Sequence, residues 1–175
     1  MIIGKKVVRL AQVDSTNEEA RRLIKQGEGE GLVVIAASQT QGRGKPGSRW
    51  LSPAGNLYFS AVVKPYRDPR ALASITLIGA LAARRALAGI ARLTVVIKWP
   101  NDLLVRGKKI GGVLTERVPS GHLIIGIGLN LNAAPALPTA TSLKKERGRG
   151  CRVDRCAALL AAALEREYLA YLGKV

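Results

Sequence analysis

The sequence has few of the residues that build metal centres and redox sites. It contains one histidine, His122, and two cysteines, Cys151 and Cys156. Their spacing is neither C-x-x-C nor one that is typical of zinc sites. No metal site made of protein side chains is therefore expected. A disulfide between Cys151 and Cys156 is not expected in a cytosolic protein, although the sequence leaves the redox state of the two thiols open.

Long apolar runs are missing as well. The longest uncharged apolar stretch, Ala71 to Ala83, is well short of the roughly 20 residues that span a bilayer, and it predicts a buried helix. No signal peptide is predicted, because the apolar start of the chain is interrupted at once by Gly4, Lys5 and Lys6 and leaves no apolar segment of the necessary length. We expect a cytoplasmic protein that does not enter a membrane. With 47% hydrophobic composition, residues 1–175 are expected to form one domain.

Acidic and aromatic residues are scarce. The sequence has only 12 Asp and Glu residues but 28 Lys and Arg residues, which gives a formal net charge of +16. Such an excess is typical of proteins that bind polyanions. The basic residues are dispersed, however, and 4% aromatic composition leaves few rings on which bases can stack. Specific DNA binding is therefore not expected.

Periodicity and turn residues predict helices early in the chain and hairpins late in it. Ser15 and Glu18 form a capping-box pattern at the start of a helix that ends at Gly27. Asp68-Pro69 is expected to open the apolar helix, and Asp154 to cap a last helix that reaches residue 172. Strands are predicted at 5–13, 32–37, 56–63, 93–99, 103–106, 109–118 and 122–130, and loops at 38–55 and 133–152. This order favours the α/β (α+β) class, with a mixed, largely antiparallel sheet flanked by helices.

The segment 42–47 reads GRGKPG and fits the dinucleotide-binding pattern G-x-G-x-x-G. That pattern requires a helix directly after the glycines. Pro53 and Gly55 prevent such a helix, and no G-K-[ST] is present. A glycine-rich loop that carries Arg43, Lys45 and Arg49 remains. Such a loop suits a phosphate, although solvated charges on a surface loop explain it equally well.

Glycines also interrupt two predicted strands. Lys109 precedes Gly111 and Gly112, and alternation places Gly126, Gly128, Asn130 and Asn132 on one face. A strand face without side chains is either a bulge or a slot for a flat ligand. Lys98-Trp99-Pro100-Asn101-Asp102 adds rings, an amide and a carboxylate at a strand end.

Six ordered motifs resemble those of biotin protein ligases. They are DSTN (14–17), QTQGRG (39–44), RWLSPAGNLY (49–58), KWPND (98–102), KKIGGVL (108–114) and GIGLN (126–130). The resemblance spans about residues 7–172. It implies the fold of class II aminoacyl-tRNA synthetases and of biotin and lipoate ligases.

The resemblance implies a reaction in two steps. Biotin and ATP give biotinyl-5′-adenylate, and a lysine of a biotin carboxyl carrier protein then accepts the biotin. Mg²⁺ is expected to arrive with ATP. The first nucleophile is already an anion, so positioning and charge neutralisation suffice, and no Ser-His-Asp triad is needed. Homodimers occur in the family, and the sequence leaves the oligomeric state open.

The resemblance also assigns roles to individual residues. It implies catalytic roles for Lys109, Arg43, Lys45 and Asp102, of which Asp102 orients or deprotonates the incoming lysine. It implies biotin contacts for Ser15, Thr16, Asn17, Gln39, Gly42, Arg43, Gly44, Lys109, Gly112 and Gly126. It implies ATP or adenylate contacts for Lys45, Arg49, Trp50, Asn101, Lys109, Gly128 and Asn130.

The sequence departs from the family pattern in the loop. Lys45 and Ser48 stand where arginines are common, which is expected to weaken retention of the adenylate. The sequence also lacks counterparts of the winged helix and the C-terminal β-barrel of longer relatives. We therefore expect no repressor activity and a less efficient transfer step. Two alternatives remain: a lipoate–protein ligase of the same fold, or a module that binds biotin or nucleic acid without turnover.

Overall fold

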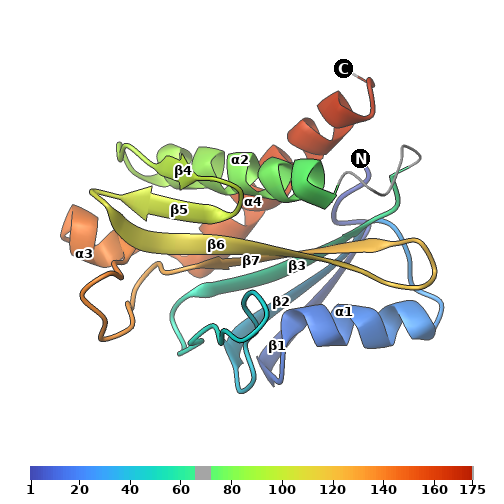
Figure 1. Cartoon of the computed structure of the whole chain (residues 1–175), viewed down its shortest axis with the longest axis horizontal. Helices are drawn as coiled ribbons and strands as arrows, with labels where there is room; N and C mark the ends of the chain where they lie inside the picture. The colour runs from blue at the N-terminus through green and yellow to red at the C-terminus, as the bar shows by residue number, and fades with distance from the viewer. Residues whose placement is uncertain (66–71, 175) are drawn as a thin grey trace.

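The computed structural model describes residues 1–65 and 72–174 and forms a seven-stranded sheet with helices on both faces (Figure 1). The strand order is β1-β2-β3-β7-β6-β5-β4; β1 and β2 are parallel, and all other neighbours are antiparallel. The strands are β1 Lys6–Val13, β2 Leu32–Gln39, β3 Leu57–Val63, β4 Val96–Lys98, β5 Asp102–Val105, β6 Lys108–Arg117 and β7 Leu123–Leu129. The helices are α1 Thr16–Lys25, α2 Leu72–Ile90, α3 Leu143–Arg147 and α4 Val153–Tyr171. The predicted fold class is confirmed.

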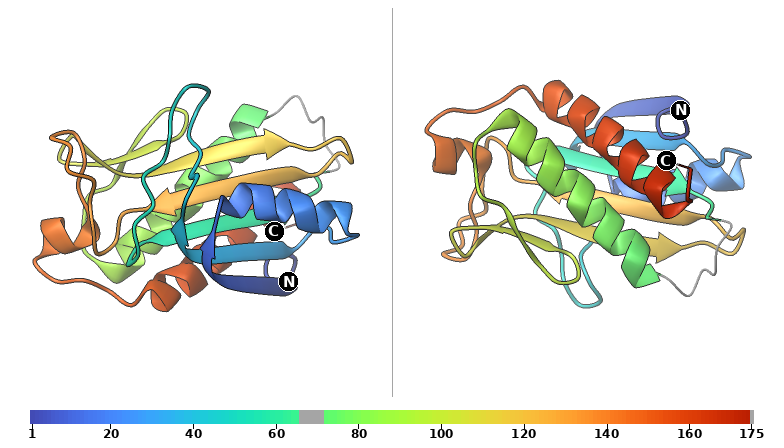
Figure 2. Two further views of the ribbon diagram at one scale, coloured as in Figure 1. Left: turned by 90° about the horizontal axis from the view of Figure 1, so that it is seen from below. Right: turned by 90° about the horizontal axis from the view of Figure 1, so that it is seen from above.

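The helices divide the molecule into layers. Figure 2 shows α2 and α4 lying across one face of the sheet and α1 lying on the other. By length and composition alone α2 is apolar enough to cross a membrane, but 56% of its apolar window is buried inside the protein. A Cβ on Gly79 would lie 2.9 Å from side chains of both Val113 and Ile125, so α2 packs tightly on the sheet. We interpret α2 as the core helix that the sequence predicts.

Alternation along β7 separates the core from the ligand side. Ile125, Ile127 and Leu129 pack in the core under α2 and α4. Gly126 and Gly128 therefore face the α1 side, where the absence of their side chains lets Asn17 and Trp50 lie directly against the sheet. The expected common orientation of the two glycines is confirmed.

Four local predictions differ from the structure. The predicted strand 93–99 is reduced to β4, since only Val96 to Lys98 pair with β5. The loop 133–152 contains α3, which Ser142 caps by accepting a hydrogen bond from the Lys145 amide. Asp154 is not the cap of α4: Arg152 holds that position, and Asp154 pairs with Arg9 at 2.8 Å. The predicted helix start at Asp68-Pro69 lies outside the described residues.

The fourth difference concerns the start of α1. Ser15 occupies the N-cap position with extended backbone angles, but its side chain makes no capping hydrogen bond. The predicted capping box is therefore wrong. The reason is tertiary, because the Ser15 side chain lines a cavity and Glu18 pairs with arginines instead.

Candidate active site

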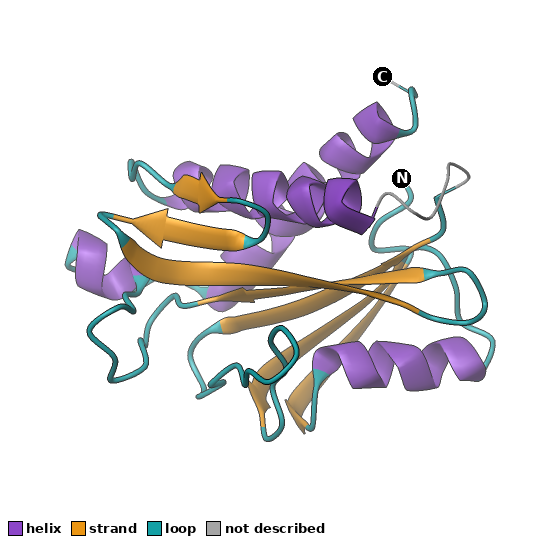
Figure 3. Ribbon diagram, in the orientation of Figure 1, coloured by secondary structure: helices purple, strands orange, loops and turns teal. Residues whose placement is uncertain are grey.

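A cavity of about 280 Å³ lies on the α1 side of the sheet, under the loop that follows β2. Its size is close to the lower end of the roughly 300–1,000 Å³ typical of small-molecule sites. Figure 3 shows this loop beside the start of α1, and the left view of Figure 2 shows it crossing the strands. The cavity brings together residues from segments far apart in the sequence. The predicted site residues that line it are Ser15, Thr16, Asn17, Gln39, Arg43, Gly44, Lys45, Arg49, Trp50, Asn101, Asp102, Lys109, Gly112, Gly126 and Gly128.

Two predicted site residues do not line the cavity. Asn130 is 2% exposed, and its side-chain amide donates to the Thr141 carbonyl at 3.0 Å, so it holds the chain beyond β7. Gly42 lies behind the wall: a Cβ there would be 2.3 Å from the Trp50 carbonyl oxygen. Both residues support the cavity from outside.

One end of the cavity is polar and uncharged. Gln39 Oε1 accepts hydrogen bonds from the Thr16 amide at 2.8 Å and from the Thr16 hydroxyl at 3.1 Å. Gln39 Nε2 donates to Ser52 Oγ at 2.8 Å, which fixes the orientation of the amide. The Ser60 hydroxyl lies 2.7 Å from Thr16 Oγ1 and 2.6 Å from Asn17 Oδ1. This end is a preformed set of donors and acceptors for a neutral polar group.

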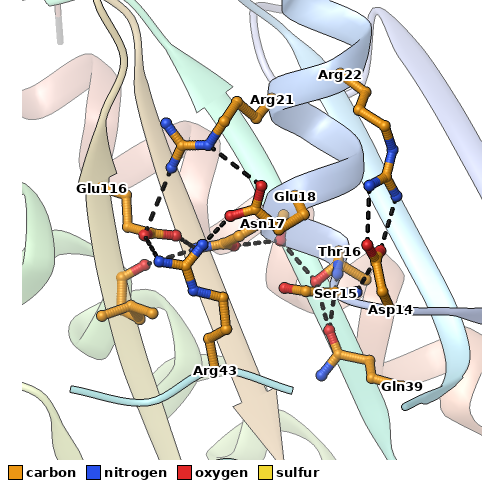
Figure 4. A network of polar contacts seen from close by, with 12 residues as sticks. Asp14, Ser15, Thr16, Asn17, Glu18, Arg21, Arg22, Gln39, Arg43 and Glu116 are labelled. Carbon is orange, nitrogen blue, oxygen red and sulfur yellow. Dashed lines mark hydrogen bonds and ion pairs between the residues drawn. The ribbon is translucent and has the colours of Figure 1, made fainter. Parts of the chain in front are cut away.

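The start of α1 holds this polar end in place (Figure 4). Asp14 Oδ1 accepts the Ser15 amide at 2.7 Å, so Asp14 rather than Ser15 orders the first turn. Both Asp14 carboxylate oxygens accept hydrogen bonds from the Arg22 guanidinium, at 2.7 and 2.9 Å. These hydrogen bonds lower the pKa of Asp14 to about 2. The carboxylate is thus charged at neutral pH and anchors the helix start.

The other end of the cavity carries charge. Lys109 Nζ lies 2.8 Å from Asp102 Oδ1 and 5.3 Å from the centroid of the Trp50 ring. The Trp50 ring lies against Gly128, where a Cβ would come within 2.6 Å of the indole nitrogen. That nitrogen is buried and has no hydrogen-bond partner among the described residues. A buried unpaired donor is costly, so it suits a site that is completed by a ligand.

A bulge in β6 aims Lys109 into the cavity. Leu103 pairs with Gly111 and Leu104 with Lys109, so Ile110 is left without a partner on β5. Strict alternation would place Lys109 and Gly112 on opposite faces. The extra residue brings them onto the same face, where a Cβ on Gly112 would lie 3.4 Å from Lys109 Cε.

The loop over the cavity is a small hairpin. Arg43 and Arg49 form an isolated antiparallel bridge, and the Trp50 amide donates to the Gly42 carbonyl at 2.9 Å. The Arg43 guanidinium points toward α1 and β6, where it contacts Glu18 and lies 2.8 Å from Glu116 (Figure 4). Arg43 thus lines the cavity with its guanidinium paired to carboxylates, and Lys45 and Arg49 line it as well.

Sequence reasoning missed several residues of the site. Glu116, Ser52 and Ser60 support it through hydrogen bonds and ion pairs, and Tyr58, whose pKa burial raises to about 12, lines it. A signal existed for Glu116, which lies two and four positions beyond Leu114 and Gly112 and so on the same strand face. Ser52 lies in a loop, and its position depends on tertiary contacts.

No group of three or more His, Cys, Asp or Glu side chains that could hold a metal occurs within residues 1–65 and 72–174. Of the described residues that line the cavity, Asp102 is the only carboxylate. It pairs with Lys109, which leaves little ligand capacity for a metal ion from the protein alone.

Comparison with known proteins agrees with this geometry. The model of the biotin/lipoate A/B protein ligase family matches residues 10–130. A biotin–[acetyl-CoA-carboxylase] ligase of Paracoccus denitrificans is 38% identical over 90% of this chain and 70% of its own length. The bifunctional ligase/repressor BirA of Bacillus subtilis is 32% identical, over 98% of this chain but only 56% of its own length.

Solved structures agree at the level of the fold. The biotin protein ligase of Aquifex aeolicus, in complex with biotin and ATP, superposes with a TM-score of 0.85 at 32% identity. The match covers 97% of this chain and 73% of that protein. Sequence motifs, cavity and fold thus agree, and the chain belongs to the biotin/lipoate A/B protein ligase family.

Proposed function

We propose that this chain is an ATP-dependent biotin–protein ligase. It forms biotinyl-5′-adenylate and transfers biotin to a lysine of a biotin carboxyl carrier protein. The observation that carries the proposal is the polarity of the cavity, which has a neutral hydrogen-bonding end at Thr16 and Gln39 and a cationic end at Lys109. Biotin has the matching polarity, with a neutral ureido ring at one end and a carboxylate at the other.

The neutral end suits the ureido ring. Asn17, Thr16 and Gln39 offer donors and acceptors but no charge, and the missing side chain of Gly126 lets Asn17 lie directly against β7 in the cavity wall. A neutral ring can be buried at this end without the cost of burying a charge. We therefore assign Ser15, Thr16, Asn17, Gln39, Gly44 and Gly126 to the biotin ring.

The cationic end suits the first chemical step. An oxygen of the biotin carboxylate attacks the α-phosphorus of ATP, the bond to the β-phosphate breaks, and pyrophosphate leaves with the electron pair. Lys109 marks this end, Lys45 and Arg49 also line the cavity, and we assign all three to neutralising the charge of the two approaching anions. Trp50, Asn101 and Gly128 border the same region and are assigned to the nucleotide.

Asp102 suits the second step. The carrier lysine attacks the carbonyl carbon of the mixed anhydride, AMP leaves, and the amine loses a proton. Asp102 lines the cavity and is positioned to orient the amine or accept that proton once Lys109 binds phosphate instead. A Mg²⁺ ion that accompanies ATP would be held mainly by the phosphates and would supply further charge neutralisation.

The oligomeric state and a cytoplasmic location remain predictions. The curated relatives are named as biotin ligases, which favours biotin over lipoate. A binding module without turnover would not release pyrophosphate.

One assay separates these functions. Pyrophosphate release is followed with ATP and Mg²⁺ in the presence of biotin, lipoate or neither. The proposal predicts that pyrophosphate is released in the presence of biotin, and neither with lipoate nor without an added acid. Release with lipoate and not with biotin would identify a lipoate ligase, and no release with either would leave a binding module.

A further inference from the structure

Among the described residues, the tip of the glycine-rich loop, residues 43–48, makes ion pairs to the rest of the protein through one side chain, that of Arg43. The Arg43 guanidinium contacts Glu18 of α1 and lies 2.8 Å from Oε1 of Glu116 on β6 (Figure 4). The backbone hydrogen bonds of residues 43–48 stay within the loop: the Gly44 amide donates to the Ser48 carbonyl, and the Ser48 amide to the Lys45 carbonyl. Within the described residues, Arg43 thus connects the loop tip to the helix and the sheet.

The carboxylates of Glu18 and Glu116 are also positioned by a second arginine, Arg21. Arg21 lies 3.5 Å from Glu18 and 3.5 Å from Glu116, so two arginines and two glutamates form a cluster without net charge. The Glu116 side chain is 15% exposed, and solvent screens a pair at this depth less than a pair at the surface. Arg43 is 44% exposed and completes the cluster from outside.

The cluster is also connected to the cavity. Asn17 Nδ2 donates to Glu116 Oε2 at 2.8 Å, while Asn17 Oδ1 accepts from Ser60. Asn17 lines the cavity floor, where a Cβ on Gly126 would lie 2.3 Å from its Oδ1 atom. A ligand that contacts Asn17 therefore acts on the residue that orients Glu116.

We infer that Glu18 and Glu116 are positioning residues that hold the loop closed over the cavity through Arg43. This inference rests on the proposed function and deepens it. The Arg43 side chain then serves closure rather than the phosphate, and Asn17 couples closure to the bound ring. Lys45 and Ser48 stand where arginines are common in the family, so the loop has fewer guanidinium groups to hold a phosphate. We therefore expect retention of the adenylate to depend on the contacts of Arg43 with Glu18 and Glu116, here called the clasp.

Glu116→Gln and Glu18→Gln test the clasp, with Glu19→Gln as the matched control. Glu19 is the next residue of α1 and pairs with Arg22 at 2.7 Å, away from the loop. Two rates are measured: trypsin cleavage after Arg43 and Arg49 without ligands, and escape of adenylate into solution per pyrophosphate released. Neutralising one carboxylate is expected to raise both rates about threefold to fivefold, the scale of one partly exposed ion pair. The control is expected to match the parent.

A double variant separates closure from direct catalysis. If Arg43 acts through the clasp, Arg43→Gln with Glu116→Gln releases adenylate no faster than Arg43→Gln alone. Additive effects, or a Glu116→Gln variant that behaves like Glu19→Gln, overturn the inference. Thermal melting confirms that each variant is folded, and Glu18→Gln repeats the test on the more exposed partner. If the parent releases no pyrophosphate, the proposed function fails while the protease rates still decide on the clasp.

Discussion

Lys109 Nζ and Asp102 Oδ1 lie 2.8 Å apart and join β6 to β5 at the cationic end of the cavity. Lys109 is assigned to adenylate formation and Asp102 to transfer of biotin. In the proposed reaction, two anions bound beside Lys109 compete with Asp102 for the ammonium group. We expect this competition to free the carboxylate for the carrier lysine, so that the first step prepares the second.

Lys109→Ala is expected to lower the rate of pyrophosphate release by about 100-fold or more, the scale of one electrostatic donor in a site shielded from water. Lys108→Ala is the control. Lys108 is exposed at the start of β6 and does not line the cavity, so its loss is expected to change the rate less than about threefold. Stopped-flow or coupled pyrophosphate assays measure both. Equal effects of the two substitutions would show that the bulge at Ile110 does not direct Lys109 as described.

Asp102→Asn is expected to separate the two steps. The amide cannot accept the proton of the carrier lysine, so transfer from preformed adenylate is expected to slow by about 100-fold. Adenylate formation is expected to fall far less, because Lys109 keeps its charge and loses a competitor. Single-turnover measurements of each step provide the test. A larger loss in adenylate formation than in transfer would refute the role given to Asp102.

Gly126→Ala is expected to raise KM for biotin about tenfold or more, because a Cβ would lie 2.3 Å from Asn17 Oδ1 and displace that side chain from the cavity wall. Gly89→Ala on α2 is the control: its Cβ would meet only Leu159, at 3.7 Å, and alanine favours a helix. Steady-state kinetics with biotin as the varied substrate measure the effect. An unchanged KM in Gly126→Ala would place the ring elsewhere.

Asp14→Asn tests the anchor of α1. The folded-state pKa of Asp14, about 2, lies below its ordinary value of 3.8. The Asp14–Arg22 pair therefore stabilises the protein above about pH 4, and this contribution is lost as the pH falls toward 2. Because both side chains are partly exposed and screened by solvent, Asp14→Asn is expected to lower the free energy of unfolding at neutral pH by at most about 1 kcal/mol.

Urea unfolding of the parent and of Asp14→Asn, near neutral pH and near pH 2, checks this prediction. The difference in the free energy of unfolding is expected to shrink at the acid end. A difference that stays constant with pH would mean that the carboxylate charge contributes nothing.

Strand alternation and short sequence motifs predicted the parts of the site that lie within single segments of the chain. Alternation placed Gly126 and Gly128 on one face, and the ordered motifs identified most residues of the cavity wall. The sequence does not reveal the bulge at Ile110, because it depends on how β5 pairs with β6. It does not reveal the partner of Glu18 either. A capping box is the local solution for that residue, and Arg43, distant in sequence, displaces it.

The central claim, that this chain attaches biotin to a carrier protein, is tested most directly by intact-mass spectrometry of a biotin carboxyl carrier domain. The domain is incubated with the protein, biotin, ATP and Mg²⁺, and in parallel without ATP. We expect the mass of one biotinyl group to be added at a single lysine, only when ATP is present. A carrier domain that stays unmodified, while the folded protein binds biotin and ATP, would contradict the account.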